Sequence, residues 1–402
     1  MPAEGPQVFS PPALSRRRFA ALSAAALGAF SHHPLSPAWA EEPPPLDLLV
    51  RSESPFNAEP ELADLIAAET TPLAHFYVRN HGPVPKVEAD AYRLSVEGLV
   101  HRPRTWKLAE VQRDFERQTV EATLTCAGNR RREMSAERPI GGIAWDAGAI
   151  GHARWEGAAL ADLLAAAEPR AGAKHVWFEG LDPITEKDGS VAPFGGSVPL
   201  SRALTPADKS PLALVAYRMN DRPLSPQHGF PLRTVVPGYI GARSVKWLTK
   251  IIVSDRPSPN HYVAEAYKLT TSADPAELAA AEPIYEFPIN SAICLPAAGA
   301  KVAAGKVRIA GYALPSGEAG ASVSRVELSV DGGRTWSQVE LLGDARPACW
   351  RLWRTEIELA AGKHALLARA TDTAGHTQPA TTPWNAKGYL HNAWHRVEVE
   401  CG

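Results

Sequence analysis

One cysteine followed by two arginines is the part of this sequence best suited to metal chemistry. Cys126 ends a run in which Val120, Ala122 and Leu124 alternate with polar residues, and residues 125–131 (TCAGNRR) then turn the chain. The alternation predicts a strand. Fixed positive charge lowers the pKa of a nearby thiol, and arginine binds small oxyanions through forked hydrogen bonds. We therefore predict a metal facing an anion; the alternative is a buried cysteine before a solvated basic turn.

Four further clusters carry polar side chains that a protein core would not tolerate unpaired. They are residues 76–85 (FYVRNHGPVP), 228–233 (HGFPLR), 238–247 (GYIGARSVKW) and 262–268 (YVAEAYK). In the third, glycines that allow close backbone approach stand beside two cations, as phosphate sites require. Each cluster alone is more typical of surface or packing than of a site. Together with the lone cysteine they predict one pocket for a phosphorylated, metal-bearing cofactor.

The elements that must position these residues are of mixed type up to about residue 285. Helix-like stretches at 61–69 and 159–167 alternate with short strands at 91–96, 175–178 and 212–217. The connections are long and rich in Pro and Gly, without the regular strand and helix alternation of a doubly wound sheet. This pattern predicts an α+β fold for a domain at 41–285.

Beyond about residue 286 the pattern indicates strands separated by turns. Strands are expected at 306–314, 323–330, 351–359, 363–370 and 394–400. They predict an all-β sandwich of immunoglobulin-like size at 286–402. Within it, residues 329–336 (SVDGGRTW) resemble an Asp-box hairpin, which shapes the fold and is no catalytic site.

The first 40 residues resemble a twin-arginine signal peptide. Residues 15–19 (SRRRF) precede a small apolar run at 20–30, and residues 38–40 (AWA) offer a cleavage site. The run is shorter than the roughly 20 residues that span a bilayer, so no membrane anchor is expected. Such leaders generally export proteins already folded around a cofactor, which predicts a periplasmic location.

Charge and cysteine content narrow the classes of partner. Removing the leader takes away three arginines and Glu4 and leaves 39 basic and 43 acidic residues, so nucleic acid is not expected as a partner. If Cys126 is a ligand, Cys294, Cys349 and Cys401 remain and at least one of them is unpaired. The sequence has no Cys-x-x-Cys-His motif, so no haem is expected.

Taken together, the motifs resemble the molybdenum-dependent sulfite oxidase family over roughly residues 50 to 400. The motifs RNH, CAGNRR, HGFPxR, GARxVKW and, at 392–397, NAWHRV follow one another in the family's order. The resemblance implies a molybdopterin domain followed by an immunoglobulin-like dimerisation domain. It also implies one Mo-molybdopterin per chain and a homodimer.

Carried over residue by residue, the resemblance implies that Cys126 is the protein thiolate on molybdenum, a metal that soft sulfur ligands suit. Arg79 and Arg131 match arginines near the substrate oxyanion, and Tyr267 matches the tyrosine beside the transferred oxygen. The implied cofactor-binding residues are Tyr77, Val78, Arg79, Asn80, His81, Asp182, His228, Arg233, Ser244, Val245 and Lys246.

One position departs from the family pattern. Where many members have Trp-Asn-x-Arg-Gly, this chain has Lys387 within residues 384–388 (WNAKG). Lysine keeps the charge but loses the fork, so anion affinity or substrate choice is expected to differ. The alternative is a surface lysine beside a packed tryptophan.

The activity implied is that of an exported sulfite dehydrogenase. It would oxidise sulfite to sulfate by oxygen transfer at molybdenum and pass electrons to a separate acceptor, such as a periplasmic c-type cytochrome. The alternatives are a sulfane-sulfur dehydrogenase subunit, a methionine sulfoxide reductase-like molybdoenzyme and, more distantly, an exported immunoglobulin-like binding protein. The C-terminal sandwich and the Arg130-Arg131 pair favour sulfite.

Overall fold

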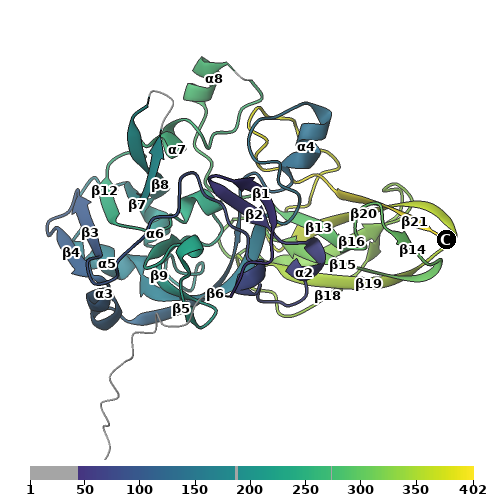
Figure 1. The fold of residues 1–402 in the computed structure, drawn as a ribbon, viewed down its shortest axis with the longest axis horizontal. Coiled ribbons are helices and arrows are strands. Elements are labelled where there is room, and N and C mark those ends of the chain that lie inside the picture. Colours follow the sequence, from purple (N-terminus) through teal and green to yellow (C-terminus); the bar gives the residue numbers. More distant parts are fainter. Residues whose placement is uncertain (1–43, 186–188, 273) are drawn as a thin grey trace, which may run out of the picture. The chain divides into compact units, whose positions relative to one another are not determined.

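Two five-stranded sheets precede residue 285 in the computed structural model, which describes residues 44–402 apart from 186–188 and 273 (Figure 1). The predicted signal peptide lies outside the described residues. One sheet contains β5 (Arg117–Thr125), β6 (Ile150–Ala159), β9 (Leu214–Met219), β10 (Arg222–Pro223) and β11 (Arg233–Val235). The other contains β3 (Arg93–Gly98), β4 (Arg104–Lys107), β7 (His175–Thr185), β8 (Val191–Pro199) and β12 (Lys250–Ser254).

These sheets are largely antiparallel. The strand order is β10-β9-β6-β5 in the first, with β11 also paired to β9, and β4-β3-β12-β7-β8 in the second. Only the β12 and β3 pair is parallel among the described strands of these two sheets. The mixed, non-alternating texture agrees with the α+β prediction. A separate hairpin precedes them, made of β1 (Leu49–Glu53) and β2 (Phe56–Glu59).

The helices are short and sit in the connections between strands. The bounds are α2 (Leu62–Leu65), α3 (Leu108–Asp114), α4 (Arg131–Glu137), α5 (Leu160–Ala167), α6 (Leu200–Ala203), α7 (His261–Ala264) and α8 (Pro275–Ala280), with 3-10 turns η1 (Leu73–His75), η2 (Pro226–His228) and η3 (Gly241–Arg243). The helix expected at 61–69 is only one turn long. After Leu65, which is buried, the next residues are mostly exposed, and no packing remains to extend the helix.

The C-terminal domain is rich in β-structure, as the sequence predicts. One sheet has the order β13 (Asn290–Leu295), β15 (Gly305–Leu314), β19 (Arg351–Leu359) and β18 (Glu340–Leu341). The other has the order β14 (Lys301–Val302), β21 (His395–Cys401), β20 (Gly362–Asp372), β16 (Val323–Ser329) and β17 (Ser337–Gln338). Apolar side chains from both sheets meet in one core, for example Ile309 and Trp353 with Val326, Leu366 and Val397.

The expected hairpin at 329–336 is present in this domain. Strands β16 and β17 pair as antiparallel neighbours on either side of it. Asp331 accepts hydrogen bonds from the backbone N–H groups of Arg334 and Thr335, each at 3.0 Å, which shapes the turn. Trp336 packs edge-on against Trp394 at 4.8 Å between ring centroids.

Strand β5, which leads to Cys126, is buried on both faces. Ala122 and Leu124 pack with Trp155 of β6 in one apolar cluster. On the other face, the Thr123 hydroxyl accepts a hydrogen bond from the Trp350 N–H at 2.9 Å, and Trp350 belongs to the C-terminal domain. The strand that positions the candidate metal ligand therefore depends on both domains.

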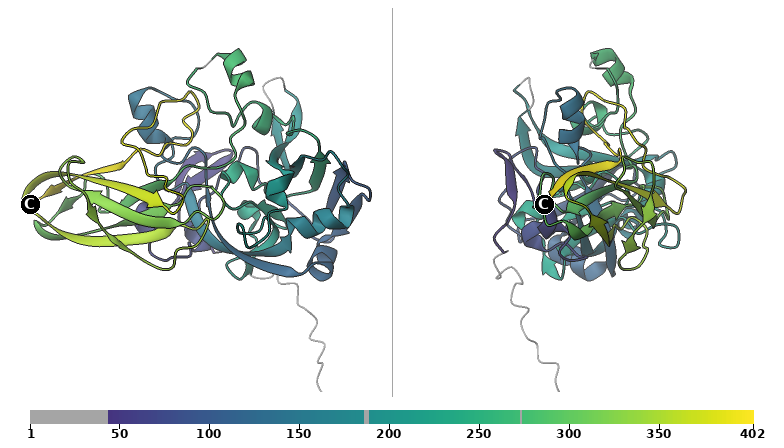
Figure 2. Two further views of the ribbon diagram at one scale, coloured as in Figure 1. Left: turned by 180° about the vertical axis from the view of Figure 1, so that it is seen from behind. Right: turned by 90° about the vertical axis from the view of Figure 1, so that its right-hand side faces the viewer.

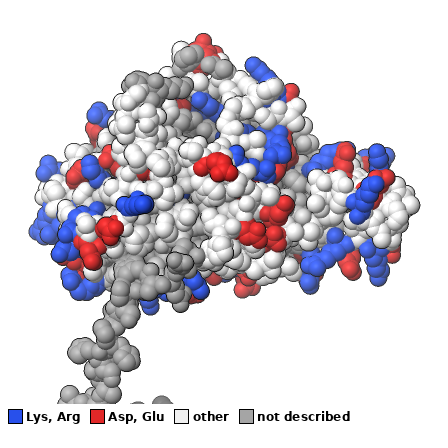
Figure 3. Space-filling view, in the orientation of Figure 1, with Lys and Arg blue, Asp and Glu red and all other residues white. Residues whose placement is uncertain are grey.

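Seen from behind, the yellow-green C-terminal strands gather beside the blue and teal elements of the first domain (Figure 2). Lys and Arg are interspersed with Asp and Glu over the face shown in Figure 3. No helix among the described residues is long and apolar enough to cross a membrane.

Candidate cofactor and substrate site

Segments far apart in the sequence converge on one cavity with about 670 Å³ of empty space, part of it open to solvent. Of the predicted site residues, it is lined by Tyr77, Arg79, Asn80, His81, Cys126, Asp182, His228, Arg233, Ser244, Lys246 and Tyr267. The polar clusters identified in the sequence therefore lie around one cavity. They lie in or directly after η1, β5, β7 and η2, which are separate elements of the fold.

Cys126 stands directly after β5, with its thiol at the wall of the cavity. Its backbone N–H donates to the Ala149 carbonyl at 2.9 Å, and the Gly128 N–H lies 3.4 Å from Sγ. A Cβ at Gly128 would come within 2.5 Å of the Arg131 guanidinium. Glycine is therefore required for the arginine to approach the cysteine loop this closely.

Asp182 reaches the cavity through an irregularity in a hairpin. The pairing of β7 with β8 shifts register between Glu179 and Pro183, so β7 continues beyond the predicted strand at 175–178. Burial raises the pKa of Asp182 to about 6, although Lys246 lowers it. Its Oδ1 is buried and has no hydrogen-bond partner among the described residues.

Two cations, the buried Arg233 and the half-buried Lys246, line the same end of the cavity. Arg233 donates to the carbonyls of His228 and Ser244 at 3.0 and 3.1 Å, and Lys246 donates to the Gln227 carbonyl at 2.8 Å and to the Asn80 side chain. Burial lowers the pKa of Arg233 to about 10 and, together with the charge of Arg233, holds that of Lys246 well below its usual value.

Buried cations of this kind favour an anionic ligand. Asp182 is the one carboxylate among the residues that line the cavity, so positive charge is in excess there. A phosphate group would give these cations charge-assisted hydrogen bonds in place of the contacts with water that they lose on burial. The donor set, with one buried thiol, therefore fits a molybdopterin cofactor.

The histidines beside these cations are neutral. His228 Nδ1 lies 2.7 Å from the Ser225 hydroxyl, and burial lowers the pKa of His228 to about 3. Burial and the charge of Arg79 hold the pKa of His81 well below its usual value. Positive charge in the pocket thus comes from arginine and lysine and not from histidine.

Tyr267 meets His81 near the cysteine. The Tyr267 hydroxyl lies 3.0 Å from His81 Nε2, and burial raises the pKa of Tyr267 far above its ordinary value. The phenol therefore keeps its proton and is available as a donor. The charges of Arg79 and Arg131 and that of Cys126 also act on this pKa, which places all four groups in one electrostatic neighbourhood.

The two arginines that follow Cys126 do not act as a pair. Arg131 donates to the carbonyls of Lys387 and Ile143 at 3.1 and 2.9 Å and lies near the Tyr267 site. Arg130 is fully buried and turns away, with hydrogen bonds to both oxygens of Glu133 and to the Ala393 carbonyl. The sequence predicted that both arginines hold an oxyanion. In the structure Arg131 lies near the site, whereas Arg130 contacts the C-terminal domain.

Four predicted residues do not line the cavity with their side chains. Val78 is buried and exchanges backbone hydrogen bonds with Ala58. Val245 is also buried, and its N–H donates to the Thr234 hydroxyl at 2.7 Å. Arg131 lies beyond the lining residues. Lys387 is partly buried and contacts Arg131 through its carbonyl, while its side chain has no hydrogen bond or ion pair among the described residues.

Two site residues were missed by sequence reasoning. Tyr389 stacks on Tyr267, and the Arg131 guanidinium lies 5.1 Å from the Tyr389 ring centroid. Arg243 is fully buried, donates to the carbonyls of Ile284 and Tyr262, and lies 5.8 Å from the Tyr267 ring. Arg243 belongs to the cluster at residues 238–247, which could have indicated it. Tyr389 lies two residues after Lys387, the position that differs from the family pattern.

The other cysteines are structural. Cys294, Cys349 and Cys401 are buried free thiols, and no disulfide joins them among the described residues. Cys349 Sγ lies 3.2 Å from the Glu121 carbonyl, and burial raises its pKa to about 12. Burial also raises the pKa of Cys294, so the thiols of Cys294 and Cys349 are protonated and unreactive.

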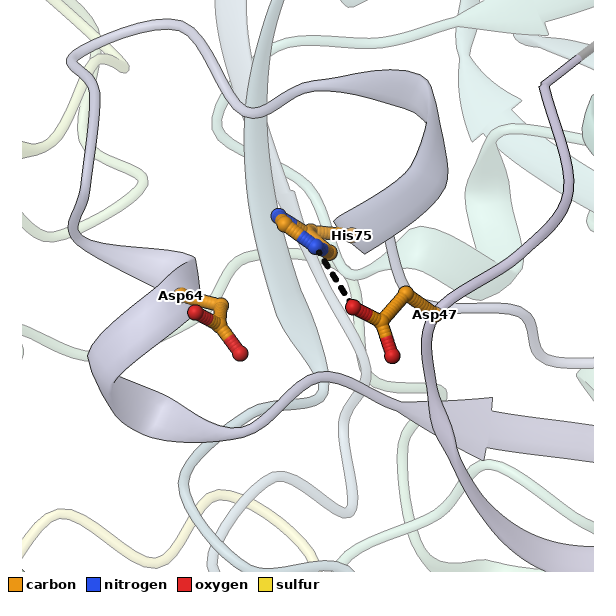
Figure 4. A group of neighbouring side chains, drawn as sticks. All are labelled: Asp47, Asp64 and His75. Atoms are coloured by element: carbon orange, nitrogen blue, oxygen red, sulfur yellow. Dashed lines mark hydrogen bonds and ion pairs between the residues drawn. The ribbon is translucent and has the colours of Figure 1, made fainter.

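A second group of possible metal ligands consists of Asp47, Asp64 and His75 (Figure 4). Asp47, Asp64 and His75 bring ligand atoms within 4.8 Å of one another, and His75 Nε2 lies 3.3 Å from Asp47 Oδ2. Asp47 is largely exposed, and none of the three residues lines the cavity. The group has the geometry of a surface ion pair with a neighbouring carboxylate.

Comparison with known proteins identifies the two domains. Residues 81–262 match the family model of the oxidoreductase molybdopterin binding domain, and residues 281–402 match that of the Mo-co oxidoreductase dimerisation domain. Among solved structures, the sulfane dehydrogenase SoxCD from Paracoccus pantotrophus has a TM-score of 0.73 at 24% identity, over 93% of this chain and 95% of that chain. That likeness establishes the shared fold.

Curated relatives are similar over most of the chain. It is 43% identical over 362 residues to sulfite oxidase of Gallus gallus, covering 87% of this chain and 77% of that protein. It is 38% identical over 392 residues to sulfite oxidase of Arabidopsis thaliana, covering 90% and 97%. It is 42% identical over 368 residues to the mitochondrial sulfite oxidase of Homo sapiens, of which it spans 65%. With these similarities and the cavity described above, the chain belongs to the sulfite oxidase family of molybdopterin-binding oxidoreductases.

Proposed function

We propose that the protein oxidises sulfite to sulfate, with water supplying the oxygen and with two electrons and two protons released. The observation that carries this proposal is that Cys126, Arg79 and Tyr267 line one cavity, while Arg131 lies against the ring of Tyr389, which stacks on Tyr267. Two guanidinium groups suit a small dianion, and a phenol suits an oxygen acceptor. The relatives named as sulfite oxidases support the same substrate.

The residues divide the work between cofactor and substrate. When bound, molybdopterin would supply a redox metal that exchanges an oxygen atom and two electrons. Cys126 would hold the metal, while Arg233, Lys246 and neutral His228 would bind the anionic end of the cofactor. At the other end, Arg79 and Arg131 would hold the substrate anion. Tyr267, which hydrogen-bonds His81, would donate to the transferred oxygen.

The cellular setting is part of the proposal. Residues 1–40 would direct export by the twin-arginine pathway, and the enzyme would act in the periplasm. Electrons would pass to a separate acceptor such as a c-type cytochrome, since the sequence carries no haem-attachment motif. The β-rich C-terminal domain, with two sheets around one core, would be an immunoglobulin-like sandwich.

The test measures chemistry and metal in one sample. The exported form is purified from a host supplied with molybdate, and cytochrome c reduction is followed after sulfite is added. Sulfite-dependent reduction with near one molybdenum per chain is expected. Metal without sulfite turnover would contradict the substrate and favour a sibling molybdoenzyme, with thiosulfate or a sulfoxide as the next substrates to assay. Protein without molybdenum from that host would contradict the cofactor.

The match of residues 281–402 to a dimerisation domain supports a homodimer as the working state. Sedimentation equilibrium over a hundredfold range of protein concentration tests this directly. A mass of two chains is expected throughout, and a single-chain mass at all concentrations would contradict it.

A further inference from the structure

The turn around Lys387 is attached to Arg131 by backbone contacts. Arg131 Nε donates to the carbonyls of Lys387 and Gly388 at 3.1 and 3.3 Å. Gly388 has φ +62°, and a Cβ there would lie 2.7 Å from Arg131 Cγ. Asn385 is buried and fixes Tyr389 through two hydrogen bonds, from its Nδ2 to the Tyr389 carbonyl at 2.8 Å and from the Tyr389 N–H to its Oδ1 at 3.0 Å. The backbone of Tyr389 is therefore held without help from its ring.

The ring of Tyr389 contacts two candidate substrate groups. The Arg131 guanidinium lies 5.1 Å from its centroid. The Tyr267 ring also lies 5.1 Å away, at an interplanar angle of 19°. Tyr389 thus joins a cation from the start of α4 to a phenol from the segment after α7. Contacts of these two kinds are favourable and depend on geometry.

The hydroxyl of Tyr389 makes no hydrogen bond in the part of the chain that the structure describes. Burial raises the pKa of Tyr389, and the charges of Arg131, Cys126 and Arg79 also act on it. The hydroxyl therefore carries its proton and lies in the same neighbourhood as the residues proposed to bind substrate.

We propose that Tyr389 is a positioning residue for the oxyanion. Its ring holds the Arg131 guanidinium and the Tyr267 phenol in fixed positions relative to one another. The inference rests on the proposed function in taking the anion to be sulfite or its product sulfate. Arg131 donates to two carbonyls from Nε and to the Ile143 carbonyl from Nη1, and these contacts fix the guanidinium within its plane but still allow that plane to tilt. An aromatic face against the guanidinium restricts that tilt and so lowers the entropic cost of binding an anion.

The experiment compares Tyr389→Phe, which keeps the ring, with Tyr389→Leu, which removes it. Sulfite kinetics, molybdenum content and calorimetric binding of sulfate to the holoenzyme are measured for each. Tyr389→Leu is expected to raise the sulfite KM and the sulfate Kd about tenfold while kcat changes by less than about twofold. Tyr389→Phe is expected to stay within about threefold of the unsubstituted protein in both constants.

A matched control removes a similar contact elsewhere. Arg369 lies 4.1 Å from the Trp336 ring in the C-terminal domain, and Trp336→Leu is expected to leave both constants unchanged. If Tyr389→Leu does not retain molybdenum, Tyr389→Met, which better fills the space without an aromatic face, takes its place. Unchanged KM and Kd in the metal-loaded variant without the ring would overturn the inference, as would an equal rise in Trp336→Leu.

The sulfate measurement separates this inference from the proposed function. An unsubstituted protein that binds sulfate but does not oxidise sulfite would contradict the proposed function. A tenfold weaker sulfate Kd in Tyr389→Leu would still support the positioning role. An unsubstituted protein that oxidises sulfite, with no effect of Tyr389→Leu on either constant, would contradict the positioning role alone.

Discussion

At the scale of single residues, burial decides which groups in the cavity carry charge. His81 and His228 are neutral and Tyr267 keeps its proton, because each is removed from water. Arginine retains its charge under the same burial, as the pKa of about 10 for Arg233 shows. The pocket therefore presents permanent positive charge beside neutral donors, which suits an anionic cofactor and an anionic substrate.

Replacing Cys126 by serine tests the proposed metal ligand. A hydroxyl is a hard, weakly acidic ligand, so sulfite oxidation is expected to fall by at least about 100-fold while the fold persists. Steady-state rates and near-UV circular dichroism measure the two effects. Cys349→Ser is the control, because a hydroxyl can still donate to the Glu121 carbonyl there. Full activity of Cys126→Ser would disprove the ligand assignment.

Lys387 tests the departure from the family pattern. If its side chain faces the substrate, Lys387→Arg restores a bidentate donor and is expected to lower the sulfite KM by roughly three- to tenfold. Lys387→Met is expected to raise it by a similar factor. Both constants come from initial rates at constant ionic strength. A KM unchanged in both variants would show a surface lysine whose backbone alone contacts Arg131.

At the scale of elements, the side chains of Arg130, which precedes α4, and of Arg131, its first residue, diverge. Arg130 has φ +65°, which allows its side chain to bridge Glu133 and the C-terminal domain while Arg131 stays near the cavity. Its other acceptors are the Asn290 side chain and the Ser291 carbonyl. The first turn of α4 is thus the place where the cysteine loop is fixed to the second domain.

Removing Arg130 is expected to cost about 2–4 kcal/mol of unfolding free energy. Arg130→Gln loses four acceptors and leaves Glu133 without its arginine partner, although His391 and His395 remain nearby and the carboxylate, which is 37% exposed, regains water. Urea unfolding at pH 7 measures the change. Arg113→Gln, which removes an exposed pair with Asp114, should give no measurable change. A cost equal to that control would refute the structural role.

The same pair predicts a dependence of stability on pH. Burial alone would raise the pKa of Glu133, but Arg130 holds it well below its usual value. A folded pKa below the unfolded one gives stability that is present above about pH 5 and is lost as the pH falls. The difference in unfolding free energy between the unsubstituted protein and Glu133→Gln should therefore shrink progressively below about pH 4. A difference that stays constant down to about pH 3 would contradict the ion pair.

At the scale of the whole molecule, the two domains share a core. Tyr312, Leu314, Trp350 and Leu352 of the C-terminal domain belong to the same apolar cluster as Ile150 of β6. The Tyr312 hydroxyl also donates to the Ala147 carbonyl at 2.9 Å and accepts from the Asn129 side chain at 3.1 Å. The residues that line the cavity come from the first domain, but the apolar core that contains Ala127 of the cavity wall is shared with the second domain.

Residues 44–285 alone are expected not to form the native cavity. Without the second domain, the partners of Arg130, Thr123 and Asn129 are lost, and the shared apolar cluster is exposed to water. Loss of near-UV circular dichroism and binding of a hydrophobic dye measure this for the fragment against the full chain. A fragment with native spectra that binds molybdenum would contradict the shared core.

The sequence by itself determined the change from a mixed α+β pattern to an all-β pattern along the chain. It also determined the strand that leads to Cys126 and most residues that line the cavity. These follow from local properties: alternation sets the face of β5, and unpaired polar clusters must find a ligand or one another. Tertiary structure alone decided that Arg130 turns away, that Val78 and Val245 are buried without lining the cavity and that Tyr389 joins Arg131 to Tyr267. The directions of Arg130 and Tyr389 depend on contacts between residues more than 100 positions apart, such as Arg130 with Ala393 and Tyr389 with Tyr267, and no local pattern encodes such distances.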